Sequence, residues 1–403
     1  RIGPDGYIKK GYENLLLQSN QFDTTWIIPS SLNITANQVG YDGSNDAWLI
    51  DKSGSFANLR QDISPSGIYT FSVYLKAGTL DWAAVFFIGG GSAYVDLTNG
   101  VLGNVTATLI DAKIESIGNG WYRFSITDDA SISSARIYPA DGNQDLSGTT
   151  GSIYIQDAQL NQGLVAYPYL ETTTAPAQGG LLENTPRLDW SNGVPSVLVE
   201  EGSTNLIRNS EYFGSNSGWL PIGSSQTIVN QQNIVDSVAF EIQSTVNTQS
   251  RIYYDGLFNF LNNYTATLLV KPSSNPPKYL GFTVDNNTSP SVYYDFTTND
   301  FFDGIDSGAS TKCKSVLLEN DWRLLTISAY ENPGQARMNI YQGSDRVGNT
   351  LEGITGQSYY LKYVQVEQAS TPSSYIPTYG TTQTRSKEVI SDDFNIPITA
   401  TIY

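Results

Sequence analysis

An internal repeat constrains this chain more than any other feature of its sequence. Residues 14–22 read NLLLQSNQF, and residues 205–213, which begin 191 positions later, read NLIRNSEYF. Both copies have Ser five positions after Asn and Phe eight positions after it, and a Trp follows each copy, at Trp26 and Trp219. Self-similarity over such a distance indicates a duplicated structural unit. The chain is therefore expected to contain one module written twice.

The spacing between matching positions grows along the chain. Trp121 and Trp322 follow matching turns and lie 201 positions apart, whereas the closing segments that begin at Tyr169 and Tyr375 lie 206 positions apart. A spacing that only increases indicates insertions in loops between strands that both copies share. The two modules should therefore have the same strand order.

The composition and the residue alternation predict an all-β fold. The chain has 36 Gly and 26 Tyr but only 15% charged residues, which suits short strands joined by turns. Residues 69–75 and 264–271 alternate between the two faces of a strand, and Gly-rich turns such as Asn99-Gly100 separate such runs. Roughly 160 to 175 residues per copy fits a jelly roll. We expect two tandem jelly-roll β-sandwiches joined by short β-hairpin connectors.

The domain boundaries follow from turns and from a stretch poor in bulky residues. Asp5-Gly6 and Asn192-Gly193 are hairpin-type turns ahead of the two copies, and residues 172–180 are rich in Thr, Gly and Ala. The expected divisions are a connector hairpin at 1–13, a first jelly-roll module at 14–172, a linker and connector hairpin at 173–204, a second jelly-roll module at 205–380 and the start of a further C-terminal segment at 381–403.

Charge and residue types exclude several classes of function. A net charge of −17 would repel nucleic acid, and the longest apolar run, residues 82–88, is too short to insert in a membrane as a helix. The chain has no His, so it lacks the usual general base of hydrolytic enzymes. It has one cysteine, Cys313, which is too few for an intrachain disulfide or a Cys-based zinc site. No signal peptide opens the chain, and because it begins with Arg1 it is expected to be processed or a piece of a longer protein. No carboxylate pair stands in a distinctive motif, so we expect no enzymatic activity and assign no catalytic residue.

Several motifs resemble those of a known family. They are the run VLVEEGSTNL at 197–206 with Asn209-Ser210 and Phe213 after it, and the closing YIPT at 375–378 followed by Thr384-Arg385. In these residues the chain resembles the tandem lectin-like jelly-roll modules of bacteriophage fibre and spike proteins, which are concanavalin A-like or carbohydrate-binding-module-like. The first copy departs from the pattern, with GYEN at 11–14 and YLET at 169–172.

The resemblance implies a fibre or appendage protein on the virion surface, outside the cell. Its lectin-like modules would bind host or environmental glycans, and its partners would be other virion proteins and cell-surface glycans. One alternative is a purely structural fibre or capsid-decoration subunit without a glycan ligand. A second alternative is the carbohydrate-binding region of a secreted bacterial protein.

Aromatic residues without a counterpart in the other copy are the candidates for sugar binding. Shared aromatics such as Trp121 and Trp322 are expected in the core, whereas an unshared flat ring can pack against the C–H groups of a sugar. Ordinary sheet aromatics are the alternative interpretation of the same residues. The five candidates are Trp48, Trp82, Tyr253, Tyr254 and Tyr293.

Two acidic turns are candidate calcium sites, because calcium binds oxygen ligands from closely spaced carboxylates. One contains Asp42 and Asp46, and the other contains Asp300, Asp303 and Asp306. Acidic turns without a bound ion are common, so structural turns are the alternative. No other cofactor is expected.

The short connectors favour a homo-oligomer, with a trimer as the expected form. An isolated two-stranded hairpin is marginal in water, so residues 1–11 and 187–201 need a surface to cover them. A neighbouring subunit could bury the apolar face of Trp190, Val197 and Val199. The alternative is that each hairpin folds back on its own module.

Overall fold

The computed structural model describes most of the chain, and the described part is almost entirely β. Besides its strands it has one 3-10 turn, Glu319–Asp321. None of the described helical residues forms a segment long and apolar enough to cross a membrane. The described residues are 11–180, 187–189, 194–214, 217–221, 226–234, 237–258, 263–284, 292–303, 312–330, 336–347 and 350–388.

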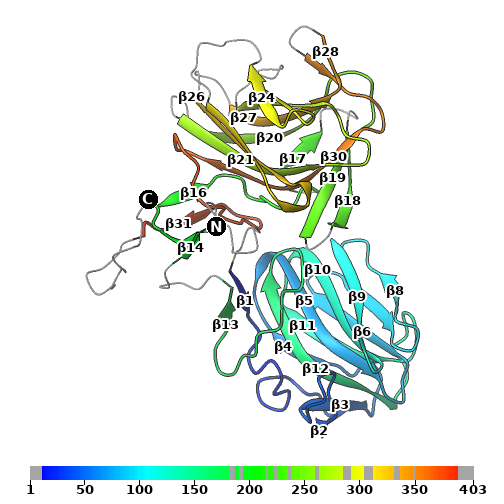
Figure 1. The fold of residues 1–403 in the computed structure, drawn as a ribbon. Helices are drawn as coiled ribbons and strands as arrows, with labels where there is room; N and C mark the ends of the chain where they lie inside the picture. The colour runs from blue at the N-terminus through cyan, green and yellow to red at the C-terminus, as the bar shows by residue number, and fades with distance from the viewer. Residues whose placement is uncertain are drawn as a thin grey trace. The chain divides into compact units, whose positions relative to one another are not determined.

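The chain divides into two compact units, which we call module 1, residues 11–183, and module 2, residues 184–403 with the N-terminal decapeptide. Module 1 has two antiparallel sheets and a small strand pair, β1 (Tyr12–Asn14) with β13 (Ala177–Gly179) (Figure 1). The six-stranded sheet has the order β2 (Leu32–Gln38), β3 (Ala47–Lys52), β12 (Gly151–Gln162), β5 (Ser66–Ala77), β10 (Trp121–Ser131), β9 (Asp111–Gly118). The five-stranded sheet has the order β4 (Leu59–Asp62), β11 (Ser134–Ala140), β6 (Trp82–Ile88), β7 (Ser92–Asp96), β8 (Val101–Val105).

Module 2 repeats this arrangement and adds one edge strand to its second sheet. Its first sheet has the order β18 (Gln226–Ile234), β19 (Ser237–Ser244), β30 (Ser358–Glu367), β21 (Asn263–Pro272), β26 (Arg323–Tyr330), β25 (Lys312–Leu317). Its second sheet has the order β17 (Trp219–Pro221), β20 (Ser250–Phe258), β27 (Ala336–Gly343), β22 (Tyr279–Val284), β23 (Val292–Asp295), β24 (Asp300–Asp303). Three strand pairs complete it: β14 (Arg187–Asp189) with β15 (Ser196–Leu198), β16 (Ser203–Asn205) with β31 (Gln383–Arg385), and β28 (Asp345–Val347) with β29 (Thr350–Glu352).

The expected fold class is confirmed: both modules are all-β jelly-roll sandwiches, and their strand orders agree. Part of the last increase in spacing, from 201 to 206, falls between β27 and β30, where module 2 carries the additional hairpin β28–β29. A further segment was expected to start at 381. In the structure β31 instead returns to pair with β16, so it is part of module 2. Residues 1–10 of the first expected connector lie outside the described residues.

Strand alternation separates a core face from an outer face on each sheet. On β5 the side chains of Phe71, Val73 and Leu75 are fully buried between the sheets, and the Phe71 ring lies 6.2 Å from that of Phe87 on β6. Ser72 and Tyr74 point to the other side of β5. We call this side of the six-stranded sheet its outer face, and we use the same name for the equivalent side in module 2.

The repeated Asn ties β1 to β12 in module 1 and β16 to β30 in module 2. In module 1 the Asn14 amide donates to the carbonyl of Leu170 at 2.8 Å, and its Oδ1 accepts the N–H of Leu160 at 3.1 Å. In module 2 Asn205 donates to Ile376 at 2.8 Å and accepts from Val366 at 3.2 Å. Both Asn side chains are fully buried. The first shared residue of the repeat is therefore a structural tie.

The repeated Ser makes a second tie in each module. The hydroxyl of Ser19 lies 2.7 Å from the phenolic oxygen of Tyr169, and that of Ser210 lies 2.7 Å from Tyr375. The Ser210 hydroxyl also accepts the N–H of Thr378 at 2.9 Å. The shared residues at both ends of the repeat thus hold the module closed.

Trp121 and Trp322 are buried, as expected, but on the outer face and not between the sheets. They are 1% and 5% exposed. Trp121 packs with Tyr74 and Tyr41, whereas Trp322 packs with Leu269 and Tyr363. The outer face of the sheet that contains β5 in module 1, and of the sheet that contains β21 in module 2, therefore carries a small aromatic cluster of its own.

Candidate functional site

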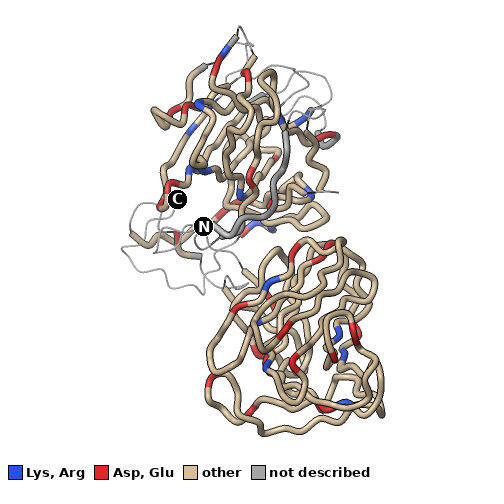
Figure 2. The backbone as a smooth tube through the Cα atoms, turned by 90° about the vertical axis from the view of Figure 1, so that its right-hand side faces the viewer, with Lys and Arg blue, Asp and Glu red and all other residues tan. Residues whose placement is uncertain are grey.

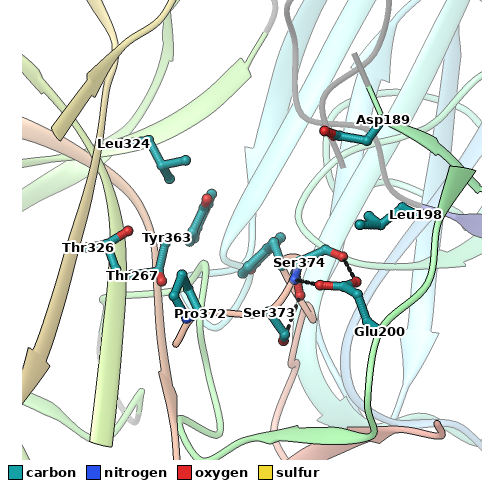
Figure 3. A pocket seen from close by; sticks show the side chains of 11 residues that line it. Asp189, Leu198, Glu200, Thr267, Leu324, Thr326, Tyr363, Pro372, Ser373 and Ser374 are labelled. Carbon is teal, nitrogen blue, oxygen red and sulfur yellow. Dashed lines mark hydrogen bonds between the residues drawn. The ribbon is translucent and has the colours of Figure 1, made fainter. Parts of the chain in front are cut away.

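A pocket of about 220 Å³ opens on the outer face of module 2. Three strands form its floor, the loop after β30 forms one wall, and the connector hairpin β14–β15 and the residues after it form the other (Figure 3). The residues that line it are Asp189, Leu198, Glu200, Thr267, Leu324, Thr326, Tyr363, Pro372, Ser373, Ser374 and Tyr375.

The floor residues face the pocket because of strand alternation. Leu268 on β21 and Leu325 on β26 are fully buried on the core side, so Thr267 and Leu324 project to the outer face. On β30 the ladder shifts register beside Leu269, and this bulge helps to place Tyr363 on the same face.

Tyr363 and Tyr375 form the aromatic end of the pocket. Their rings are stacked with centroids 3.8 Å apart and an interplanar angle of 22°. Burial raises the pKa of both phenols, and the carboxylate of Glu211 raises them further. Both phenols are therefore neutral at physiological pH. Tyr363 is 2% exposed beneath its partner, so the partly buried Tyr375 is the ring that meets the pocket.

The Thr267 hydroxyl is the unusual polar group of the pocket. Thr267 is 6% exposed, and its Oγ1 has no hydrogen-bond partner among the described residues. Figure 3 shows this side chain beside Thr326 on the pocket floor. A buried hydroxyl without a partner costs about 1–3 kcal/mol. A ligand that bonds to this oxygen would recover that free energy.

Glu200 fixes the wall that the connector forms. Its carboxylate accepts the N–H of Ser374 at 2.7 Å, and the Ser374 hydroxyl donates to the same group (Figure 3). Arg385 Nη1 lies 3.1 Å from Glu200 Oε2, and backbone hydrogen bonds join Glu200 to Glu388. The described part of this connector therefore folds back on its own module, which was the alternative interpretation of the hairpin.

In module 1 the side chain of Arg123 occupies the place on the outer face that corresponds to the pocket. Strand pairing aligns Arg123 with Leu324, because Arg123 pairs with Tyr74 on β5 and Leu324 pairs with the matching Leu269 on β21. The Arg123 Nη2 donates to the carbonyl of Tyr167 at 2.5 Å, and the guanidinium lies 5.5 Å from the ring centroid of Tyr74. The equivalent position in module 2 is an apolar Leu, and there the pocket is open.

Arg123 also bonds to the hydroxyl that matches Thr267. Ser72 and Thr267 are equivalent, since they pair with Ser125 and Thr326 on the next strands. Arg123 Nη2 lies 3.2 Å from Ser72 Oγ. The hydroxyl that has no described partner in module 2 is therefore bonded in module 1.

The structure places three of the five predicted sugar-binding aromatics in the interior, where their side chains have structural contacts. Trp48 is 5% exposed, and its Nε1 donates to the carbonyl of Asn20 at 2.9 Å. Tyr254 is 4% exposed, and its hydroxyl accepts the backbone N–H of Arg208 at 3.2 Å. Tyr293 is fully buried under Phe302. None of these rings presents a face to a ligand.

The other two predicted aromatics are half-buried and are not among the residues that line the pocket. Trp82 lies on the side of the five-stranded sheet that faces away from the core, against a cluster that contains Tyr138. Tyr253 lies between two guanidinium groups, 5.9 Å from Arg251 and 4.9 Å from Arg337. The structure does not bring any of the five predicted rings together.

The first candidate calcium turn bonds to its own neighbours. Asp42 Oδ1 accepts from the N–H and the hydroxyl of Ser44, and these hydrogen bonds lower the pKa of Asp42. Asp46 Oδ1 accepts from Gln156 Nε2 at 2.7 Å. Within the described residues no group of three or more His, Cys, Asp or Glu is placed to hold a metal ion.

The second candidate calcium turn is an antiparallel strand in the structure. Asp300 begins β24 and Asp303 ends it, and β24 pairs with β23. Asp306 lies outside the described residues.

The pocket residues were missed because they carry no motif. Thr267 and Leu324 are ordinary strand residues in the sequence, whereas Tyr363 is an aromatic without a counterpart, because Asp157 occupies its position in module 1. The signal that could have found them is the charge difference between Arg123 and Leu324 at matching strand positions.

No family model matches the sequence, and no curated protein matches it. Among solved structures, the chain is similar to the tandem CBM22-1–CBM22-2 domain of Xyn10C from Paenibacillus barcinonensis, with 12% identity, a TM-score of 0.28 and coverage of 90% of this chain and 99% of that one. It is also similar to the tandem CBM51 modules of Sp3GH98 from Streptococcus pneumoniae, with 11% identity, a TM-score of 0.19 and coverage of 80% and 84%. An exo-β-1,3-galactanase from Phanerochaete chrysosporium follows at 12% identity and a TM-score of 0.23, with coverage of 85% and 82%. At TM-scores this low, none of these similarities indicates what this chain does.

Proposed function

We propose that this chain is a non-catalytic glycan-binding protein and that module 2 takes one sugar residue in its outer-face pocket. The observation that carries the proposal is the buried Thr267 hydroxyl, which has no described partner and lies in a pocket with an aromatic end at the partly buried Tyr375. Sugar binding uses this combination, in which a flat ring packs against C–H groups and polar atoms bond to the hydroxyls.

The size of the pocket fits one small ring. Its volume of about 220 Å³ is below the roughly 300–1,000 Å³ of pockets that enclose drug-sized ligands. A glycan would therefore place a single residue in the pocket, and the rest of its chain would extend into solvent. The many Tyr, Asn and Gly residues of the chain suit such shallow contacts.

We further propose that the protein is part of a virion appendage, as the resemblance of residues 197–206 and 375–378 to bacteriophage fibre modules implies. The excess of 39 acidic over 22 basic residues suits an extracellular surface that avoids nucleic acid. Figure 2 shows the acidic residues spread over both modules. The carbohydrate-binding region of a secreted bacterial protein is the second candidate setting, and the same pocket supports it equally.

A glycan-array screen of the full chain tests the proposal, with Thr267→Val as the diagnostic variant. Valine has nearly the shape of threonine and lacks the hydroxyl, so we expect the fold to be kept and the array signal to fall about tenfold, the loss of one good hydrogen bond. Thr355→Val, at an exposed position outside the pocket, is the matched control and should bind as the wild type does. If no glycan binds the wild type, the purely structural alternative replaces this proposal.

A further inference from the structure

The side chain that fills the outer face of module 1 indicates what the pocket of module 2 accepts. Arg123 places a cationic group between the Ser72 hydroxyl and the carbonyl of Tyr167, at 3.2 and 2.5 Å. The matching positions in module 2 are Thr267 and Ser373, and both line the open pocket. The duplicated face thus keeps its hydrogen-bond acceptors but lacks its resident donor.

The charge of the pocket suits the same kind of group. Among the described residues that line it, Asp189 and Glu200 are acidic and none is basic. Figure 3 shows both carboxylates on the side of the pocket that the connector forms, across from the strand residues Thr267 and Leu324. Arg385 offsets part of the charge of Glu200, since they form an ion pair at 3.1 Å. An anionic sugar would meet two carboxylates, whereas a cation would be attracted.

The geometry of binding follows from the open floor. Leu324 is shorter than Arg123 and has no donor, so the buried Oγ1 of Thr267 lacks the hydrogen bond that Ser72 receives in module 1. A hydroxyl oxygen accepts hydrogen bonds from charged donors especially well, and such bonds are stronger than those between neutral groups. The partly buried ring of Tyr375, which Tyr363 supports from behind, would pack against the body of the ligand.

We propose that the pocket of module 2 selects a cationic hydrogen-bond donor, and in glycan terms a hexosamine residue with a free amino group. This inference rests on the proposed glycan-binding function of the same pocket. Its ammonium group would take the place that the Arg123 guanidinium has in module 1, bonded to Thr267 and facing the carboxylates of Asp189 and Glu200. N-acetylation would remove the charge and add bulk, so acetylated and neutral sugars would bind more weakly.

Isothermal titration of the full chain tests this with four probes at neutral pH: a glucosamine pentamer, its N-acetylated form, a glucose pentamer and methylguanidinium. We expect the glucosamine pentamer to bind at least about tenfold more tightly than either neutral pentamer, and methylguanidinium to compete with it. Leu324→Arg should abolish binding by filling the pocket as Arg123 fills its counterpart. Leu317→Arg adds the same charge at a 58% exposed position on β25 and should leave binding unchanged.

Each other outcome overturns a distinct claim. Equal binding of the glucose and glucosamine pentamers would overturn the selectivity and leave glycan binding intact. If methylguanidinium binds and none of the sugars does, the glycan function is overturned, and only the selection of a cationic donor is kept. Glucosamine binding that survives Leu324→Arg would place the site elsewhere. If Leu324→Arg fails to fold by circular dichroism, Thr267→Val takes its place, and undiminished glucosamine binding by that variant would overturn the site.

Discussion

The phenol of Tyr41 donates a hydrogen bond to Oδ2 of Asp157 at 2.9 Å, on the outer face of module 1. Asp157 is 6% exposed and has a left-handed backbone conformation, with φ at 51°. It occupies the position in module 1 that Tyr363 has in module 2, 206 residues later. A carboxylate is therefore buried where the other module has an aromatic ring.

This burial predicts a pH-dependent stability. Burial raises the pKa of Asp157 to about 7, the charges of Asp46 and Asp42 raise it further, and hydrogen bonds from Tyr41 and Tyr169 oppose the rise. In the unfolded chain the pKa of Asp is about 3.9. Because the folded pKa is the higher one, Asp157 stabilises the fold most below about pH 4, and this stabilisation is lost as the pH rises towards and through about 7.

Asp157→Asn should therefore flatten the pH profile of module 1 between about pH 4 and 8. Asn tolerates the left-handed backbone as Asp does, so the substitution should not strain the chain. The measurement is the urea midpoint of unfolding across this range, with Asp51→Asn, an exposed aspartate of the same module, as the control. A variant with the same slope as the wild type would show that Asp157 titrates normally.

Trp121→Ala should destabilise module 1 by about 3–5 kcal/mol, the usual cost of deleting a large buried aromatic side chain. Trp121 is 1% exposed and contacts Tyr41, at a centroid distance of 6.4 Å. Ile117→Ala, at a 41% exposed position on the neighbouring strand β9, should cost less than about 1 kcal/mol. Denaturant melts measure both, and a cost below about 1 kcal/mol for Trp121 would contradict its burial.

Asn205→Ala should destabilise module 2 by at least about 2 kcal/mol. It leaves the N–H groups of Ile207 and Val366 and the carbonyl of Ile376 buried without their partner, and each such group costs about 1–3 kcal/mol. At low pH, where its acid is neutral, Asn205→Asp keeps an acceptor oxygen and has one O–H donor in place of the two N–H donors of Asn, so it should lie between the wild type and the alanine variant. Thr204→Ala, next to it on the same strand, is the control.

How far the sequence predicts this protein depends on whether a residue serves the shared fold. Asn14 and Asn205 were recognisable because both modules need the same closing hydrogen bonds. The repeat therefore predicted the strand order and the burial of Trp121 and Trp322. It could not show that the tryptophans lie outside the sheets, since residue alternation does not say which face of a strand meets the second sheet.

Unshared aromatics proved a poor guide to the candidate site, because different residues can do the same structural work. The Tyr254 hydroxyl accepts the N–H of Arg208, whereas Gln61 accepts the matching N–H of Leu17 at 2.8 Å in module 1. Tyr254 is therefore unshared in sequence yet structural in role. The informative difference was Leu324 against Arg123, and its meaning depends on the pairing of strands far apart in the sequence.

The proposed homo-oligomer predicts a trimer of about three times 44.1 kDa in solution. On the connector of module 2, Leu188 and Val194 are 38% and 60% exposed, although Leu198 of the same hairpin lines the pocket. Apolar side chains on a short hairpin gain stability when a neighbouring subunit covers them. Leu188→Asp should therefore shift the assembly towards the monomer, whereas Leu317→Asp, at an exposed position on β25, should not. Light scattering over a dilution series at micromolar concentration measures both, and a wild-type mass near 44.1 kDa throughout would contradict the trimer.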